Sequence, residues 1–394
     1  MTTAPSEGRR GSLDRLLASR EIAVVCGPGG VGKTTIAAAT AAMAACHHGG
    51  KVLVVTVDPA RRLADALGLE GLENTATRVP EEAFKEAGAS PRGELWAAML
   101  DTKQAWDRLV RRHAPDPTTA RRILENPLYQ NITGRFVQSH DYIAVERLYE
   151  IHLDGEYDLI VVDTPPTRNA LDFLDAPARM ADFFSSRLLR ILTVPYKSRL
   201  VNLATRPFYQ VADRILGTQF LQDIAEFFIL FQTMAPGFVE RAQAVSRLLR
   251  DRRTSFIVVS TLEAAPAREA EFFVDVLTAR RFHLGAIVLN KVLPTYLRDA
   301  GGAASRLAER LEHEAPAAAD ALAALVPDEG NARLAQVLAE VAQNFVRFQL
   351  VAQREAEQET MLGRVPDVVA TVPSFDDDIV DLAGLLALGE RLCG

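Results

Sequence analysis

The stretch that decides the fold of this 394-residue chain is Gly27-Pro28-Gly29-Gly30-Val31-Gly32-Lys33-Thr34. It matches the phosphate-loop pattern G-x-x-x-x-G-K-[ST] at every position. An apolar run, Ile22 to Val25, precedes it, and an alanine-rich stretch from about Thr35 to Ala45 follows. The loop is therefore expected to join a strand to a helix, which is the context that the pattern requires. The sequence predicts a binding site for a nucleoside triphosphate.

The residue types in this loop each suit a part of the nucleotide. Glycines let successive backbone N–H groups surround phosphate oxygens, and the N-terminus of the helix adds its partial positive charge. We expect Lys33 to reach the β- and γ-phosphates of ATP and the Thr34 hydroxyl to bind Mg²⁺. The residues expected to contact the nucleotide in this part of the chain are Gly27, Gly29, Gly30, Val31, Gly32, Lys33, Thr34 and Thr35.

Two acidic residues stand at the ends of predicted strands. Asp163 follows the apolar run Leu159–Val162, where a carboxylate is expected to hold a Mg²⁺-bound water. Asp58 follows Val52–Val57 and is expected to position the attacking water. Each has a structural alternative, since Asp163 could cap a helix and Asp58 could start a turn.

Short β-branched runs recur between long helical stretches. The candidate strands are Ile22–Cys26, Val52–Val57, Leu95–Leu100, Leu159–Val162, Phe256–Ser260, Ala286–Leu289 and Val368–Val372. Most of them are continuously apolar, which is typical of parallel strands buried on both faces. The pattern predicts an α/β fold with a doubly wound, mainly parallel sheet, as in P-loop NTPases.

The helical stretches suggest how the chain is divided. We expect residues 1–19 to be a flexible N-terminal tail and residues 20–394 a single P-loop ATPase domain. Helical inserts at about 102–154 and 168–253 are expected to form a helical subdomain above the nucleotide site. A further helical stretch, 303–364, is expected to cover one face of the sheet.

The second insert is rich in phenylalanine and, in its first half, in basic residues. Its phenylalanines are Phe183, Phe184, Phe208, Phe220, Phe227, Phe228, Phe231 and Phe238. One interpretation is a buried helical core with a solvated basic face. The other is an apolar groove, or a lipid-facing surface, that changes with the nucleotide state. The sequence leaves both interpretations open.

Composition narrows the class of partner. A net charge of −7 argues against nucleic acid, because binding to a phosphate backbone needs a basic face. The three cysteines are scattered, which predicts neither a disulfide framework nor a zinc site and fits a reducing cytoplasm. The polar N-terminus predicts no signal peptide, and no run approaches about 18 apolar residues, so any membrane role is expected to be peripheral.

Two segments around the acidic residues resemble motifs of the ArsA/GET family, which comprises arsenical pump-driving and tail-anchored-protein targeting ATPases. The family patterns D-P-A-H-x-L-x-D and D-T-A-P-T-G-H-T are similar to residues 58–65, DPARRLAD, and 163–170, DTPPTRNA. Residues 288–291, VLNK, resemble the segment whose asparagine reads adenine. Residues 372–375, VPSF, resemble the loop that packs on the base.

The resemblance implies an Mg²⁺-dependent ATPase of the SIMIBI type that works as a dimer. It implies that Asp58 is the switch I carboxylate, that Asp163 is the switch II residue, and that Asn290 and Pro373 contact the base. It also implies that the helical subdomain binds a hydrophobic client or a membrane-protein partner.

One departure from the family concerns catalysis. The family form of the loop begins K-G-G, and its lysine acts across the dimer interface, but this chain has Pro28 there. Losing a cation that neutralises the transferring phosphate can cost several orders of magnitude in rate. A lysine-bearing paralogue could supply the charge in a heterodimer, or Arg61, Arg62 or Arg168 could supply it locally. We favour the heterodimer, and a slow homodimer is the remaining case.

Two other functions are considered. A MinD/ParA-like positioning ATPase would usually carry a basic amphipathic tail or a basic DNA-binding face, and the C-terminal segment 375–394 shows neither. A nucleotide-binding regulatory subunit with little hydrolysis of its own is compatible with Pro28. Direct arsenite transport is not expected, because the chain has no cysteine cluster.

Overall fold

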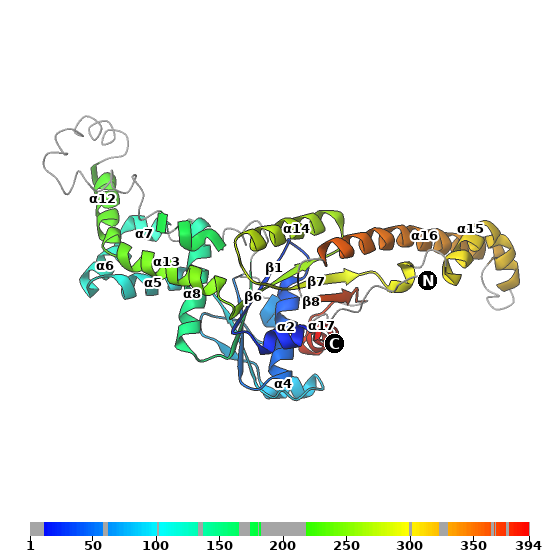
Figure 1. The fold of residues 1–394 in the computed structure, drawn as a ribbon, viewed down its shortest axis with the longest axis horizontal. Coiled ribbons are helices and arrows are strands. Elements are labelled where there is room, and N and C mark those ends of the chain that lie inside the picture. The colour runs from blue at the N-terminus through cyan, green and yellow to red at the C-terminus, as the bar shows by residue number, and fades with distance from the viewer. Residues whose placement is uncertain are drawn as a thin grey trace.

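A computed structural model describes residues 12–57, 62–100, 102–132, 137–164, 174–179, 181–182, 218–298, 302–322, 330–363, 366, 368–375 and 378–393. Within these residues, one sheet has the strand order β3-β4-β2-β5-β1-β6-β7-β8 (Figure 1). The strands are β1 Ile22–Cys26, β2 Lys51–Thr56, β3 Thr77–Arg78, β4 Glu94–Met99, β5 Leu159–Asp163, β6 Thr254–Ser260, β7 Leu284–Val292 and β8 Val368–Pro373. All neighbours pair in parallel except β3 and β4. The predicted α/β class and the mainly parallel sheet are confirmed.

The apolar runs predict the strands well because the central strands are buried on both faces. Every residue of β1, β5 and β6 is buried. The strand missed by the sequence is β3, which has two exposed residues and pairs antiparallel with β4. Such a short polar edge strand has no apolar run by which to recognise it.

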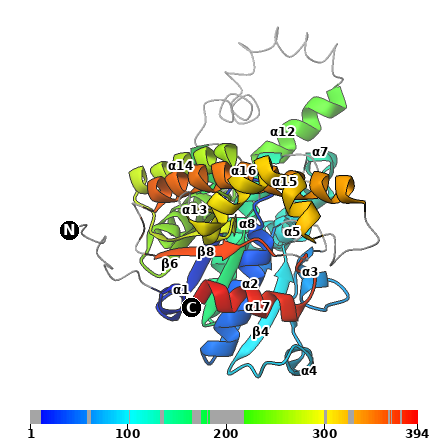
Figure 2. The ribbon, with the colours of Figure 1, turned by 90° about the vertical axis from the view of Figure 1, so that its right-hand side faces the viewer.

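Helices cover one face of the sheet around the alanine-rich helix that follows the phosphate loop. The helices on this face are α1 Leu13–Ala18, α2 Lys33–His47, α3 Arg62–Ala66, α4 Glu81–Glu86 and α17 Leu382–Cys393. Alanines along α2 let neighbouring chain segments approach closely. A side chain at Gly389 of α17 would collide with Met43, so α17 lies directly against α2, as Figure 2 shows.

Helix α1 corrects the prediction for the N-terminal tail. Residues 13–18 were expected to be flexible, but they form a helix whose Leu13 and Leu17 belong to the core of this face. This amphipathic segment has only six residues and lies in a polar stretch, so its apolar spacing is too short to predict a helix. The rest of the predicted tail, residues 1–11, lies outside the described residues.

The opposite face carries α8 Val137–Asp154, α13 Ala235–Arg250 and α14 Ala264–Ala279. Two of these helices extend beyond the sheet into a helical subdomain. The other helices of the subdomain are α5 Thr102–His113, α6 Pro117–Glu125, α7 Pro127–Ile132 and α12 Thr218–Gln232. The described parts of the predicted inserts are therefore mainly helical.

The described phenylalanines of the second insert form the core of this subdomain. Phe227, Phe231 and Phe238 are buried, and Phe228 packs against them. The interpretation as a buried helical core is confirmed for Phe227, Phe231 and Phe238, and Phe228 is partly buried against them. The side chains of Phe183, Phe184, Phe208 and Phe220 lie outside the described residues. The groove or lipid-facing surface stays a prediction for that part.

A long helical hairpin follows β7. The 3-10 helix η1 Thr295–Arg298 leads into α15 Ala303–Leu322, which packs along the 32-residue helix α16 Asn331–Leu362. Figure 1 shows the hairpin projecting from the end of the molecule opposite the helical subdomain. The stretch expected to cover a sheet face does so mainly through the C-terminal end of α16, where Leu362 joins the core of the second face.

Candidate nucleotide-binding site

The phosphate loop leaves the carboxyl end of β1 at the centre of the sheet. A Cβ atom at Gly27 would collide with the Val259 carbonyl oxygen of β6, so only glycine fits between the two strands. Helix α2 begins at Lys33 directly after Gly32, which has a φ of 93°. The N-terminus of a 15-residue helix thus lies at the predicted phosphate position. Burial raises the pKa of the preceding Cys26 thiol far above its usual value, which disfavours the thiolate form that a nucleophile needs.

Lys33 lies within its own loop. It is buried, and its Nζ donates a hydrogen bond of 2.8 Å to the Pro28 carbonyl oxygen. This contact holds the side chain against its own loop. A buried ammonium at the start of a helix provides a strong local charge for binding an anion. Thr35 follows on the first turn of α2 and is half-buried.

Thr34 and Asp163 are brought together as the sequence predicts. The Thr34 Oγ1 donates to Asp163 Oδ2 at 2.8 Å, although 129 residues separate them. Asp163 is 1 % exposed at the end of β5. A hydroxyl and a carboxylate oxygen beside the phosphate loop are the hard oxygen donors that Mg²⁺ prefers. The residues present therefore fit the metal that the sequence implies.

Thr56 is a site residue that the sequence reasoning missed. Its hydroxyl donates to the same Asp163 Oδ2 at 3.0 Å, from the adjacent strand β2. The two residues are register partners across β2 and β5. Two hydroxyl donors fix the orientation of the carboxylate, which is what a metal anchor needs. The available signal was a hydroxyl residue ending an apolar strand beside β5.

Thr164, the residue after Asp163, is held against β1 by two hydrogen bonds. Thr164 is buried, and both its N–H and its hydroxyl donate to the Val25 carbonyl oxygen, at 3.1 and 2.9 Å. Residues 165–173 lie outside the described residues, and so does Asp58 with residues 59–61. The roles of Asp58, Arg61 and Arg168 therefore stay predictions.

Asn290 and Pro373 lie at the ends of neighbouring strands. Asn290 is in β7, and its Nδ2 donates to the Val31 carbonyl oxygen at 2.8 Å. Pro373 ends β8, where it pairs with Val292 of β7. Both are thus near the phosphate loop side of the sheet. Their predicted contact with the adenine base stays a prediction.

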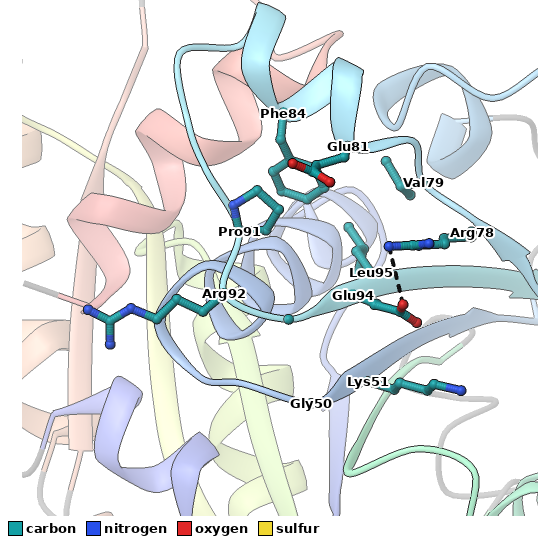
Figure 3. A pocket seen from close by; sticks show the side chains of 11 residues that line it. Gly50, Lys51, Arg78, Val79, Glu81, Phe84, Pro91, Arg92, Glu94 and Leu95 are labelled. Carbon is teal, nitrogen blue, oxygen red and sulfur yellow. Dashed lines mark ion pairs between the residues drawn. The ribbon is translucent and has the colours of Figure 1, made fainter.

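A hollow of about 430 Å³ lies at the amino-terminal ends of β2 and β4, away from the phosphate loop at the carboxyl end of β1 (Figure 3). Arg78 and Glu94 face each other there at 3.2 Å. Arg92 points away and donates to the His47 carbonyl oxygen. Protein groups thus satisfy these arginines, and the hollow plays no part in the nucleotide site.

Comparison with known proteins identifies the family of this chain. The family model described as Anion-transporting ATPase matches residues 20–316. The chain belongs to this family. It is 29 % identical to an uncharacterized protein of Streptomyces coelicolor, over 69 % of this chain and 62 % of that protein. It is 26 % identical to a putative arsenical pump-driving ATPase of Aquifex aeolicus, over 69 % of this chain and 63 % of that protein.

A third relative matches from end to end. The ATPase BagA of Mycobacterium tuberculosis is 24 % identical over 100 % of this chain and 98 % of its own length. The match to the first two relatives spans less than two thirds of their lengths. The family confirms the sequence resemblance and a P-loop ATPase fold with a nucleotide-binding site. Among the described residues, no helix is both long and apolar enough to cross a membrane.

Proposed function

We propose that this protein hydrolyses ATP with Mg²⁺ as a dimer and transmits its nucleotide state to a client or membrane-protein partner through the helical subdomain. The proposal places it in the cytoplasm, next to a membrane if the partner is a membrane protein. The observation that carries it is the Thr34–Asp163–Thr56 cluster beside the phosphate loop. This cluster sets oxygen groups suited to Mg²⁺ beside a phosphate-binding loop, the arrangement that phosphoryl transfer uses.

The chain's own residues would divide the reaction as follows. Loop N–H groups and Lys33 hold the phosphates and neutralise charge, once Lys33 exchanges the Pro28 carbonyl for phosphate oxygens. Thr34 and Asp163 would hold Mg²⁺, which when bound would supply positive charge to stabilise the charge that develops on the phosphates. Asp163, fixed by two hydroxyls, would orient the metal's water shell, and Asp58 would position the attacking water.

Two helices support the proposed coupling. In α8, Val145 and Leu148 pack in the core against the sheet, while Tyr142 packs in the subdomain core. In α13, Leu249 packs in the core against the sheet and Phe238 packs in the subdomain core. Helix α8 also ends shortly before β5, the strand that carries Asp163. A displacement at the end of β5 can therefore reach the subdomain through continuous, packed structure.

Pro28 favours a second candidate, a regulatory subunit that binds ATP and hydrolyses little of it. Proline provides neither the lysine charge nor a backbone N–H at this position of the loop. A paralogue that keeps the lysine would restore the missing charge in a heterodimer. A homodimer would have to rely on Arg62, exposed at the start of α3, or on Arg61 and Arg168.

Turnover measured over a range of protein concentrations tests the proposal. ATP hydrolysis should depend on Mg²⁺, should rise per molecule as dimers form, and should be lost in Lys33→Ala and Asp58→Asn variants. Hydrolysis that appears only after addition of a lysine-bearing paralogue would establish the heterodimer. The chain could bind ATP tightly yet show no turnover, either alone or with the paralogue. That result would contradict the proposed ATPase activity and favour the regulatory subunit.

A further inference from the structure

Asn290 makes a contact that reading a base does not require. Its side chain connects β7 to the phosphate loop, 259 residues earlier, through a buried hydrogen bond of 2.8 Å from Nδ2 to the Val31 carbonyl oxygen. Asn290 is 9 % exposed and Val31 is 1 % exposed. A buried carbonyl is costly to leave without a hydrogen-bond donor. The bond therefore contributes to holding the loop.

The backbone of β7 is bent in a way that aims this amide. Lys291, the next residue, has a φ of +57°, a left-handed conformation that is unfavourable for a residue other than glycine. In this conformation its N–H donates to Asn290 Oδ1 at 3.0 Å. The pairing of β7 with β8 shifts register between Leu289 and Val292. Strain of this kind persists where the surrounding structure imposes it and is frequent at functional sites.

The loop is shaped to receive the amide. A Cβ atom at Gly32 would lie 2.5 Å from Asn290 Nδ2, so the amide rests on the glycine that immediately precedes α2. One side chain thus fixes Val31 through its carbonyl and Gly32 through direct packing. These two residues precede Lys33 and Thr34, which start the helix and carry the predicted phosphate and metal contacts.

We propose that Asn290 is a positioning residue for the phosphate loop and that its effect on phosphate binding does not depend on a base. Its amide holds Val31 and Gly32 so that the N–H groups at the start of α2 point in one direction before ATP arrives. Pre-ordering of this kind strengthens binding by removing the cost of ordering the loop. The proposal rests on the proposed function of the same site, because it assumes that the loop binds phosphate.

A ligand that has phosphates and no base provides the test. Binding of magnesium tripolyphosphate and of Mg²⁺–ATP would be measured by calorimetry for the wild type and for Asn290→Ala. The matched control is Asn126→Ala in the helical subdomain. Asn126 is also buried, and its amide likewise bridges two segments, donating to the Asp223 carbonyl oxygen at 3.2 Å and accepting from the Leu128 N–H at 2.8 Å.

Asn290→Ala should weaken tripolyphosphate binding about tenfold, the effect of one lost buried hydrogen bond of about 1.4 kcal/mol. Asn126→Ala should leave this affinity unchanged. Weaker ATP binding with unchanged tripolyphosphate binding would overturn the proposal, because Asn290 would then act only on the base. Equal weakening in both variants would also overturn it, since general loss of stability would explain the result. A wild type that binds neither ligand would refute the proposed function itself.

Hydrogen exchange without ligand provides a measurement that does not depend on binding. Asn290→Asp keeps the shape and the acceptor oxygen but removes the donor, and no phosphate is present for its charge to repel. Backbone amides of residues 32–34 should exchange faster in this variant than in the wild type, and at the wild-type rate in Asn126→Asp. Unchanged exchange in Asn290→Asp would show that the contact does not hold the loop.

Discussion

The two helical regions at the ends of this molecule bury their apolar residues to very different degrees (Figure 1). In the helical subdomain, Trp106 and Phe238 are surrounded by other aromatic rings, with ring centroids 6.1 Å apart. On the α15–α16 hairpin, the inner contacts come from small residues such as Ala342 and Ala352. Large apolar side chains of α16, including Phe348, remain exposed instead. Helical sequence alone therefore does not make a core, because residue size on the inner face decides how much surface is buried.

Ion pairs in the two helical regions also differ in how far they are buried. In the subdomain, Arg241 Nε donates to Glu146 Oε1 at 2.6 Å, with side chains only 13 % and 3 % exposed. Burial raises the pKa of Glu146 even though Arg241 acts to lower it. On the hairpin, Arg310 and Glu314 form an ion pair of 3.1 Å that is 72 % and 58 % exposed. The same type of pair is thus structural in one region and solvated in the other.

The largest effect should come from one substitution made in both regions. Phe238→Ala empties the centre of the subdomain core, where Phe238 is 0 % exposed and contacts Tyr142 and Phe231. We expect a loss of about 3–5 kcal/mol in the free energy of unfolding. Phe348→Ala on α16, where the side chain is 52 % exposed, should cost about 0.5 kcal/mol or less.

Denaturant unfolding followed by circular dichroism measures both values. Because a molecule with separate helical regions can unfold in steps, the transition should be followed with more than one probe. Similar losses for the two phenylalanine variants would contradict the comparison, since they would place Phe348 in a core of its own.

The second effect concerns the two ion pairs. Arg241→Ala leaves Glu146 buried without its arginine and should reduce the free energy of unfolding by about 3 kcal/mol. Arg310→Ala removes a solvated pair and should change it by about 0.5 kcal/mol or less. Thermal unfolding of both variants at neutral pH checks the difference. An Arg241 variant as stable as the wild type would mean that Glu146 is satisfied by its other neighbours, among them the Tyr142 hydroxyl at 3.5 Å.

The sequence predicts the sheet and the phosphate loop because local patterns encode them. Continuous apolar runs mark the buried strands, and the glycine-lysine pattern marks the loop. Contacts across the sheet are not local, and two hydrogen bonds of the site were not predicted because they depend on strand order and strand bending. Thr56 reaches Asp163 only because β2 pairs with β5 in one register. The Asn290 amide reaches Val31 because a left-handed residue bends the end of β7.

Helical amphipathicity is also an incomplete guide to burial. The periodic pattern predicts helices in both inserts and over 303–364, and helices form there in the described residues. It does not distinguish two kinds of helix. In one kind, the whole apolar face is buried in a core. In the other, the apolar face is wider than the surface that the neighbouring helix covers. Helix α16 is of the second kind. Its inner face packs on α15, and a neighbouring stripe of Val337, Val341, Phe348 and Val351 faces solvent.

The smallest effect should come from making that stripe polar. Val337→Ser together with Val341→Ser changes two side chains that are 48 % and 59 % exposed, one helical turn apart. Each should cost only a few tenths of a kcal/mol in the free energy of unfolding, because little apolar burial is lost and serine and valine have similar helix propensities. The solubility of the protein should rise, because a smaller exposed apolar surface favours association less. The measurements are the thermal midpoint and the concentration at which light scattering begins. A fall in the midpoint as large as that of Phe238→Ala would show that these valines are buried in solution, and the contrast between a closed subdomain and an open hairpin would then fail at its weaker end.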